Sequence, residues 1–305
     1  MFGRLGVALT LCAVWLAPAA AATPRVVAGV KPIHSLVAGV MGEVGTPSLL
    51  ITGFSSPHDY TMRPSDARML EGADLVVWVG PSLESFLVRA LPDHARSSRV
   101  LELDRAPGVK RLPIRVGGVF EADAHETEAA NGIDGHLWLD PENGIAIVAA
   151  VQARLREIDP AHAETYARNA ATLTAELTRL DGELAQKLAP VRGTPFIVVH
   201  DAYQYLERRY GLKAAGSVTL GVETSAYAQR IAKLRRRLRE GGAVCVFAEP
   251  QFSPAILNVL VEGTDARVGV LDHLGLTLPA GPTLYGDMMR SLADTMTKCL
   301  APSAR

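Results

Sequence analysis

The sequence has 305 residues, and its 31 Lys and Arg residues against 32 Asp and Glu residues give a formal net charge of −1. A near-neutral balance gives no sign of a nucleic-acid partner, which a strongly basic chain would indicate. The length exceeds what one hydrophobic core usually holds, so we expect two lobes.

The first 22 residues have the layout of a secretory signal peptide. Arg4 supplies a positive start, residues 5–16 are apolar, and the small residues 17–22 offer a cleavage site. The apolar stretch is too short to span a bilayer, which needs about 20 apolar residues. We therefore expect a soluble chain without direct membrane insertion, exported to the periplasm and beginning at Thr23.

Short apolar runs alternate with helical patterns after this leader. Helices are expected after Pro32, from Pro64, over residues 81–91 and from near Pro141. Continuous Val-rich strands that alternate with helices are typical of parallel sheets covered on both faces, so the sequence predicts an α/β fold. The expected strands are residues 25–30, 48–51, 73–80, 99–103, 196–200, 243–250 and 266–272.

One segment, residues 159–190, predicts a single long helix. Asp159 suits the N-cap position and Pro160 the first helical position, while Pro190 ends the helix. The apolar face recurs at steps of four and three, at Tyr166, Ala170, Leu173, Leu177, Leu180, Leu184 and Leu188. We expect a leader (1–22), an N-terminal lobe (23–158), this connecting helix (159–190) as a rigid strut, and a C-terminal lobe (191–305).

Two further segments have simpler interpretations. Residues 120–135 are acidic and lack a periodic apolar face, so we expect an exposed loop. The basic run 233–240 precedes two glycines, and cations near the end of a helix complement its dipole. We interpret this run as a solvated helix face.

The cysteine count is consistent with export. Of three Cys residues, Cys12 leaves with the leader, which leaves Cys245 and Cys299. In an oxidising compartment such a pair favours a disulfide, and two buried free thiols are the alternative. The bridge would close a loop of about 54 residues and contribute about 4 kcal/mol.

Each lobe carries metal-capable side chains just beyond its strands. His58 follows the second expected strand, and His136 lies in the turn before the helix near Pro141. His200 and Asp272 end two strands of the other lobe. Ligands of open parallel sheets bind beyond the carboxyl ends of the strands. Three imidazoles and one carboxylate form a tetrahedral set that suits Zn²⁺, so we expect these four residues to bind it in a cleft between the lobes.

Local spacing alone does not establish this set, because the chain has no CxxC, HxH or HExxH motif. We assign His34, His94, His125, His162 and His273 first to surface or helix-start roles. His273 adjoins Asp272 and could substitute for it.

The chain resembles the zinc-specific periplasmic substrate-binding proteins of bacterial ABC importers (cluster A-I, ZnuA type). The resemblance extends over essentially the whole mature chain. Its main stretches are residues 58–87, 136–142, 198–212, 245–257 and 268–275.

The resemblance implies that His58, His136 and His200 bind the metal and that Asp272 holds the usual position of a fourth ligand. Manganese-binding relatives commonly have glutamate at the third position, so His200 favours zinc. The resemblance also implies a Cys245–Cys299 disulfide. It further implies a monomeric, non-enzymatic carrier that delivers Zn²⁺ to a membrane permease.

The chain departs from the family pattern at two places. Some zinc-uptake members carry an acidic residue before the first histidine, but this chain has Pro57, so Asp272 or water must complete the coordination. The loop before the second ligand is often rich in histidine, but here it contains only His125.

Other residues near the expected ligands are candidates for supporting roles. Tyr60 and Trp138 flank ligands and either exclude solvent or belong to the core. Acids that could accept a hydrogen bond from a ligand histidine are Asp59, Asp140, Asp201, Glu223 and Glu249.

Three other functions remain open at this point. A zinc-dependent hydrolase would need an open coordination position and a general base. A manganese or iron carrier of the same importer type is the closer alternative. An adhesin is a third, although no repeat or adhesive patch indicates one.

Overall fold

The computed structural model describes residues 23–94, 99–115, 120, 132–218, 224–251 and 255–302. The expected leader and most of the expected acidic loop lie outside the described residues. Among the helices of the described ranges, none combines the length and the apolar character that a membrane crossing requires.

The first sheet lies in the N-terminal half and has four parallel strands in the order β2-β1-β3-β4. Val27 and Val76 point to one face, and their neighbours Val26 and Val77 point to the other, as the two-residue period of a strand requires. The strands are β1 (Val26–Ala28), β2 (Ser48–Leu49), β3 (Leu75–Trp78) and β4 (Val100–Glu102).

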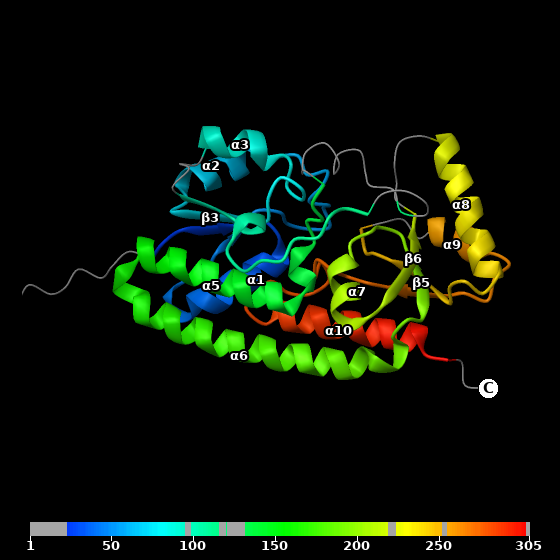
Figure 1. Cartoon of the computed structure of the whole chain (residues 1–305). Coiled ribbons are helices and arrows are strands. Elements are labelled where there is room, and N and C mark those ends of the chain that lie inside the picture. The colour runs from blue at the N-terminus through cyan, green and yellow to red at the C-terminus, as the bar shows by residue number, and fades with distance from the viewer. Residues whose placement is uncertain are drawn as a thin grey trace, which may run out of the picture.

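Helices cover both faces of this sheet, because both faces are apolar (Figure 1). α2 (Pro64–Gly72) and α3 (Leu87–His94) lie on one face. α1 (Lys31–Met41) and α5 (Pro141–Ile158) lie on the other.

The second sheet repeats this plan, with parallel strands in the order β6-β5-β7-β8. Ile197 packs toward α8 (Thr224–Arg239) and α9 (Ala255–Val261), while Phe196 packs toward α7 (Gln204–Tyr210) and α10 (Leu284–Leu300). The strands are β5 (Pro195–Val198), β6 (Lys213–Ser217), β7 (Cys245–Ala248) and β8 (Arg267–Val270). Two sheets of parallel strands with helices on both faces confirm the α/β prediction.

The long helix α6 (Ala163–Leu188) runs along both halves of the molecule (Figure 1). Of the predicted apolar face, Leu173 is partly buried and the other six residues are buried. They belong to one continuous core that reaches from α1 to α10. The long helix between lobes is therefore confirmed, whereas the lobe boundaries at residues 158 and 190 stay a prediction.

The start of the connecting segment differs from the expectation. Asp159 does not cap the helix with its side chain, since residues 160–162 form a separate 3-10 turn before α6. Its Oδ2 instead accepts a hydrogen bond from the Tyr166 hydroxyl at 2.6 Å and lies 2.7 Å from His162 Nδ1. Asp159 thus fixes the bend between α5 and α6.

Two elements were predicted incorrectly. The sequence analysis missed β6, whose segment Lys-Ala-Ala-Gly-Ser lacks the β-branched and aromatic residues that favour strands. The helix expected over residues 81–91 begins only at Leu87. The preceding segment forms turns instead, with the Glu84 carboxylate accepting a hydrogen bond from the Val79 backbone N–H at 2.7 Å.

The predicted disulfide is present between Cys245 and Cys299, whose Cα atoms are 6.1 Å apart. Cys245 begins β7 and Cys299 lies in the last turn of α10, so the bridge fixes the final helix to the second sheet.

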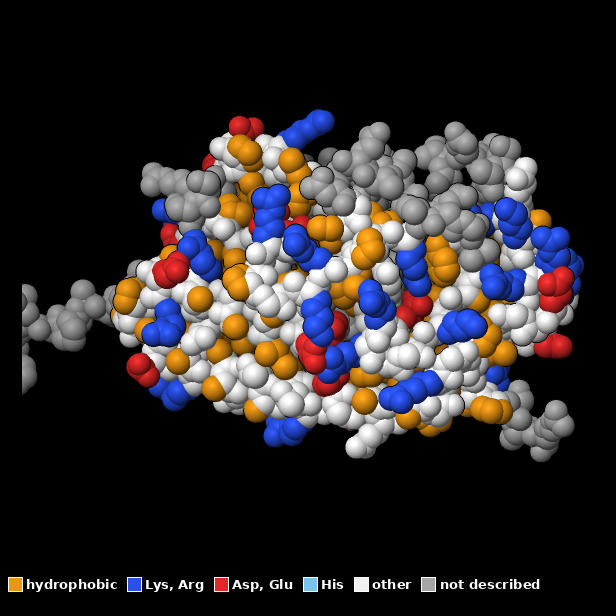
Figure 2. All heavy atoms as spheres, in the orientation of Figure 1, with side chains coloured by type: hydrophobic (Ala, Val, Ile, Leu, Met, Phe, Trp, Pro, Cys, Tyr) orange, Lys and Arg blue, Asp and Glu red, His pale blue; other side chains and the backbone are white. Residues whose placement is uncertain are grey.

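The surface agrees with the near-neutral composition. Figure 2 shows basic and acidic side chains interspersed over most of one face, with basic side chains gathered over α8 at its edge. Lys233, Arg236 and Arg239 of that helix are exposed, as expected for a solvated face.

Candidate metal centre

Three of the four predicted ligands meet between the two sheets. His58 lies in the loop between β2 and α2, and His136 directly precedes the 3-10 turn Leu137–Leu139. His200 lies just beyond the carboxyl end of β5. Each imidazole offers a nitrogen, and the three nitrogens lie within 4.8 Å of one another. The side chains therefore converge from opposite halves of the chain.

The spacing of the first pair suits a zinc ion. The Nε2 atoms of His58 and His136 are 3.4 Å apart. Two nitrogens bound to zinc at about 2.0–2.1 Å with a tetrahedral angle lie about 3.3–3.4 Å apart. The pair is thus already at the separation that a shared ion requires.

A buried carboxylate orients His136. Asp134 Oδ1 lies 2.8 Å from His136 Nδ1 and also accepts the His136 backbone N–H at 2.9 Å. A carboxylate on one ring nitrogen fixes the tautomer and directs the other nitrogen toward a metal. The sequence analysis did not single out Asp134, although its place two residues before the histidine is typical of an aspartate that bonds to nearby backbone N–H groups.

Glu249 supports His200 in a similar way. Its Oε2 lies 3.4 Å from His200 Nδ1, and its Oε1 accepts a hydrogen bond from the Tyr203 hydroxyl at 3.0 Å. Burial acts to raise the pKa of Glu249, but nearby His273 and His200 and the hydrogen bonds hold that pKa below its ordinary value.

The other candidate supporting acids have different roles. Asp140 caps α5 by accepting the Glu142 N–H at 3.0 Å, and Asp201 pairs with Arg115. Asp59 is exposed, and Glu223 lies outside the described residues.

Asp272, the expected fourth ligand, is held by hydrogen bonds within its own loop. Its carboxylate accepts hydrogen bonds from the Leu276 N–H at 2.8 Å and from the N–H and hydroxyl of Thr277 at 2.8 and 2.7 Å. The metal-capable groups found among the described residues do not include it.

The neighbouring His273 lies inside the cluster, so the first expectation of a surface or helix-start role was wrong. It is 1% exposed, and its ring centroid lies 5.4 Å from that of His136 and 5.7 Å from that of His200. Burial lowers the pKa of His273 to about 3, so the ring is neutral at physiological pH. His200, Glu249 and His273 form a second group whose ligand atoms lie within 4.8 Å of one another.

The remaining described histidines lie apart from this cluster. His34 is in the first turn of α1 as expected, but it is buried, with Nε2 2.9 Å from the Pro47 carbonyl oxygen. His94 and His162 pair with Glu71 and Asp159. The last histidine, His125, lies outside the described residues.

Contacts between the two halves surround the cluster. The Tyr205 hydroxyl donates to the Asp134 carbonyl oxygen at 2.9 Å, and Trp138 Nε1 donates to the His273 carbonyl oxygen at 2.9 Å. Lys31 Nζ donates to three carbonyl oxygens of residues 275–278. Trp138 belongs to the continuous core as well, so it both packs and encloses the site.

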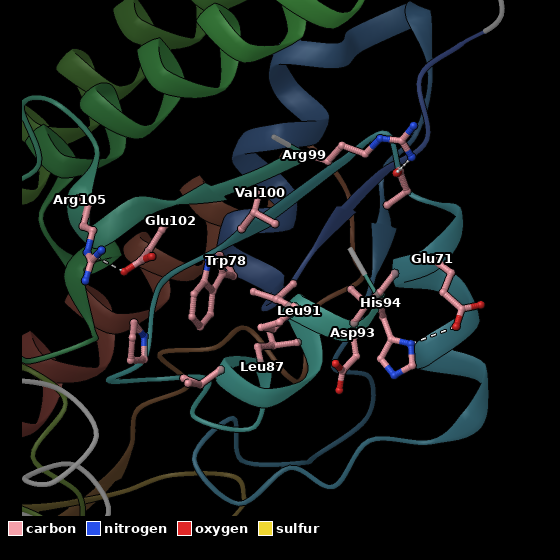
Figure 3. A pocket seen from close by; sticks show the side chains of 15 residues that line it. Glu71, Trp78, Leu87, Leu91, Asp93, His94, Arg99, Val100, Glu102 and Arg105 are labelled. Carbon is pink, nitrogen blue, oxygen red and sulfur yellow. Dashed lines mark hydrogen bonds and ion pairs between the residues drawn. The ribbon is translucent and has the colours of Figure 1, made fainter. Parts of the chain in front are cut away.

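A separate cavity of about 1020 Å³ opens between α2, α3 and β4, away from this cluster (Figure 3). Trp78 and Leu87 face its interior, and the one histidine in its lining, His94, is paired with Glu71 at 3.0 Å. A single metal ion needs converging ligand atoms and not a large volume. The candidate metal centre is therefore the histidine cluster.

Comparison with known proteins gives a consistent result. The family whose model matches residues 26–299 is described as zinc-uptake complex component A, periplasmic. A relative from Brucella suis biovar 1 (strain 1330), named high-affinity zinc uptake system protein ZnuA, is 41% identical over 305 aligned residues. The alignment covers 90% of this chain and 91% of the relative.

Solved structures show the same fold. A zinc-bound ZnuA deletion mutant superposes with a TM-score of 0.77 at 24% identity, over 93% of this chain and 100% of the other. FpvC from Pseudomonas aeruginosa in complex with Mn²⁺ superposes with a TM-score of 0.74 at 22% identity, over 93% of this chain and 100% of the other. Because one neighbour holds zinc and the other manganese, the fold does not determine the metal.

Proposed function

Because the chain belongs to the family of zinc-uptake complex component A, we propose that it is the periplasmic zinc-binding protein of an ABC importer. It binds Zn²⁺ and delivers the ion to the membrane permease of that importer. Residues 1–22 direct its export, and the mature chain acts as a monomer.

We propose that His58, His136 and His200 hold the ion. The observation that carries this assignment is the 3.4 Å separation of the His58 and His136 Nε2 atoms, which come from loops 78 residues apart and match two zinc ligands. Asp134 and Glu249 lie at the Nδ1 sides of His136 and His200, which suits coordination through Nε2.

Manganese is the closest alternative cargo. Mn²⁺ favours carboxylate, carbonyl and water oxygens, whereas imidazole nitrogens suit zinc. One carboxylate, that of Glu249, belongs to a metal-capable group with His200 and His273, whereas the group of His58, His136 and His200 offers nitrogens alone. The nitrogen-rich cluster therefore supports zinc.

A hydrolase is the alternative from another class. It would need an open coordination position and a base placed for proton transfer. Membership in a transport family supports a carrier. We propose that the zinc-loaded protein does not turn over ester or phosphate substrates, which a standard hydrolysis assay checks.

Alanine substitutions test the ligand assignment. His58→Ala, His136→Ala and His200→Ala should each weaken zinc binding at least about tenfold, because each leaves zinc short of its four preferred ligands. His94→Ala is the matched control, since that imidazole pairs with Glu71 on the surface, away from the cluster. Chelator competition measures all four variants, and wild-type affinity in two of the three site variants would contradict the assignment.

A further inference from the structure

The structure points to His273 as the fourth zinc ligand, in place of the neighbouring Asp272, which makes the site a cluster of four imidazoles. This inference rests on the proposed zinc-binding function. It adds a fourth imidazole to the three of the proposed ligand set.

His273 lies beyond the carboxyl edge of the same sheet as His200. His200, Glu249 and His273 follow β5, β7 and β8, which are adjacent in the second sheet. The carboxyl ends of adjacent parallel strands meet at one edge, where ligands of open α/β sheets bind. His273 therefore faces the same crevice as His200.

One carboxylate serves both of these histidines. Glu249 Oε2 lies 3.4 Å from His200 Nδ1 and 3.6 Å from His273 Nδ1. The Glu249 carboxylate is itself held by the Tyr203 hydroxyl at 3.0 Å and by Gln251 Nε2 at 2.6 Å. A carboxylate at Nδ1 is the usual support of a histidine that binds metal through Nε2. Glu249 thus faces Nδ1 of His273 as it faces that of His200, and Asp134 faces Nδ1 of His136 at the shorter distance of 2.8 Å.

The ring of His273 is also held in place on its other sides. It stacks on the Trp138 indole with an interplanar angle of 11° and a centroid separation of 6.1 Å. The Tyr203 ring packs against its edge at 5.7 Å. Its backbone carbonyl accepts the Trp138 Nε1–H. A ring fixed in this way loses little conformational freedom when it binds an ion.

The burial of His273 also has a functional explanation. Its Nδ1 makes no hydrogen bond within the described part of the chain. A buried polar group without a full set of partners destabilises a fold, so its presence calls for a role. Coordination would fix the tautomer and strengthen the contact between Nδ1 and Glu249.

Asp272 does not compete for the position. Its carboxylate accepts three hydrogen bonds from Leu276 and Thr277 and stabilises the loop after β8. Asp272 and His273 open a turn in which the Gly275 N–H donates to the Asp272 carbonyl oxygen at 3.2 Å, and within it His273 is buried whereas Asp272 is only partly buried.

The test compares His273→Phe with Asp272→Asn. Phe retains a ring against Trp138 but offers no ligand atom. The probe is Zn²⁺ alone, measured by chelator competition on the mature protein and by X-ray absorption of the zinc-loaded protein, which counts imidazole ligands. We expect four imidazoles in the wild type and three in His273→Phe. The Kd for zinc should rise at least about tenfold in His273→Phe and change less than about threefold in Asp272→Asn.

Other results of these measurements would contradict the assignment of His273 or the proposed function. His273→Gln is the second variant if His273→Phe folds poorly, as judged by thermal melting of the zinc-free protein. Wild-type affinity and an unchanged imidazole count in the folded variant would overturn the inference and leave the proposed function intact. A loss of zinc affinity in Asp272→Asn but not in His273→Phe would also overturn the inference, as would two zinc ions per wild-type chain. A wild-type protein that binds no zinc would overturn both.

Discussion

Substitution of Asp134 by Asn tests how the cluster is held together. Asp134 is 6% exposed, and one of its oxygens contacts both the backbone N–H and Nδ1 of His136. Asn keeps the shape, and its single carbonyl oxygen can accept both contacts, but it removes the negative charge. The variant therefore isolates the charge of the carboxylate from its packing.

The expected loss follows from the hydrogen bonds. A hydrogen bond to a charged group contributes about 1.5–3 kcal/mol and a neutral one about 0.5–1.5 kcal/mol. Removal of the charge should thus weaken zinc binding by about 1–1.5 kcal/mol, which is about a tenfold increase in Kd. This estimate agrees with the lower end of the 10- to 100-fold effects that are typical of residues supporting a metal-bound histidine.

Chelator competition measures the effect, and Asp74→Asn is the matched control. Asp74 also pairs with a basic group, Arg25, but this pair lies at the amino ends of β1 and β3, whereas His58 follows the carboxyl end of β2 in the same parallel sheet. The control should bind zinc as the wild type does. A Kd for Asp134→Asn within about twofold of the control would refute the role assigned to Asp134.

Two further predictions concern stability. The native mature protein should show no titratable thiol before reduction, and a free thiol there would contradict the disulfide. Cys299→Ser should lower the free energy of unfolding by up to about 4 kcal/mol. Zinc affinity should change little, because Cys245 begins β7 and the histidine cluster lies beyond the carboxyl end of that strand. Burial raises the pKa of Glu84 from 4.5 to about 8, so between these values the folded chain holds a proton that the unfolded chain has lost. The contribution of Glu84 to the free energy of unfolding should therefore decrease by about 1.4 kcal/mol per pH unit as pH rises through that window. In thermal melts of the zinc-free protein, the melting temperature of Glu84→Gln should fall less with pH than that of the wild type. An equal fall in both proteins would argue against the raised pKa of Glu84.

The sequence predicted the sheets because the apolar runs are intrinsically strand-forming. Val-rich segments such as those of β3 and β7 need both faces covered, which implies helices and a parallel sheet. β6 could not be found in this way, since its small residues form a strand only because β5 lies beside it. The long helix was visible because its apolar face keeps one period over many turns.

The sequence predicted the region of the candidate site, but not which side chains support the histidines or how the chain turns beside them. The positions of His58 and His200 after strands, and of His136 in the turn before a helix, predicted that the three meet in the cleft between the lobes. The choice between Asp272 and His273 depends on the turn after β8, where the alternation of side chains along a strand no longer applies. Neither hydrogen-bond partners nor such turns can be derived from residue types alone.

The central claim is that the mature chain selects zinc through imidazole nitrogens. The most direct measurement is to equilibrate the metal-free mature protein with equal concentrations of Zn²⁺, Mn²⁺ and Fe²⁺ under anaerobic conditions and to determine bound metal by mass spectrometry. We predict one zinc per chain, with manganese and iron at background levels. Manganese or iron in the site, or no stoichiometric metal, would contradict the claim.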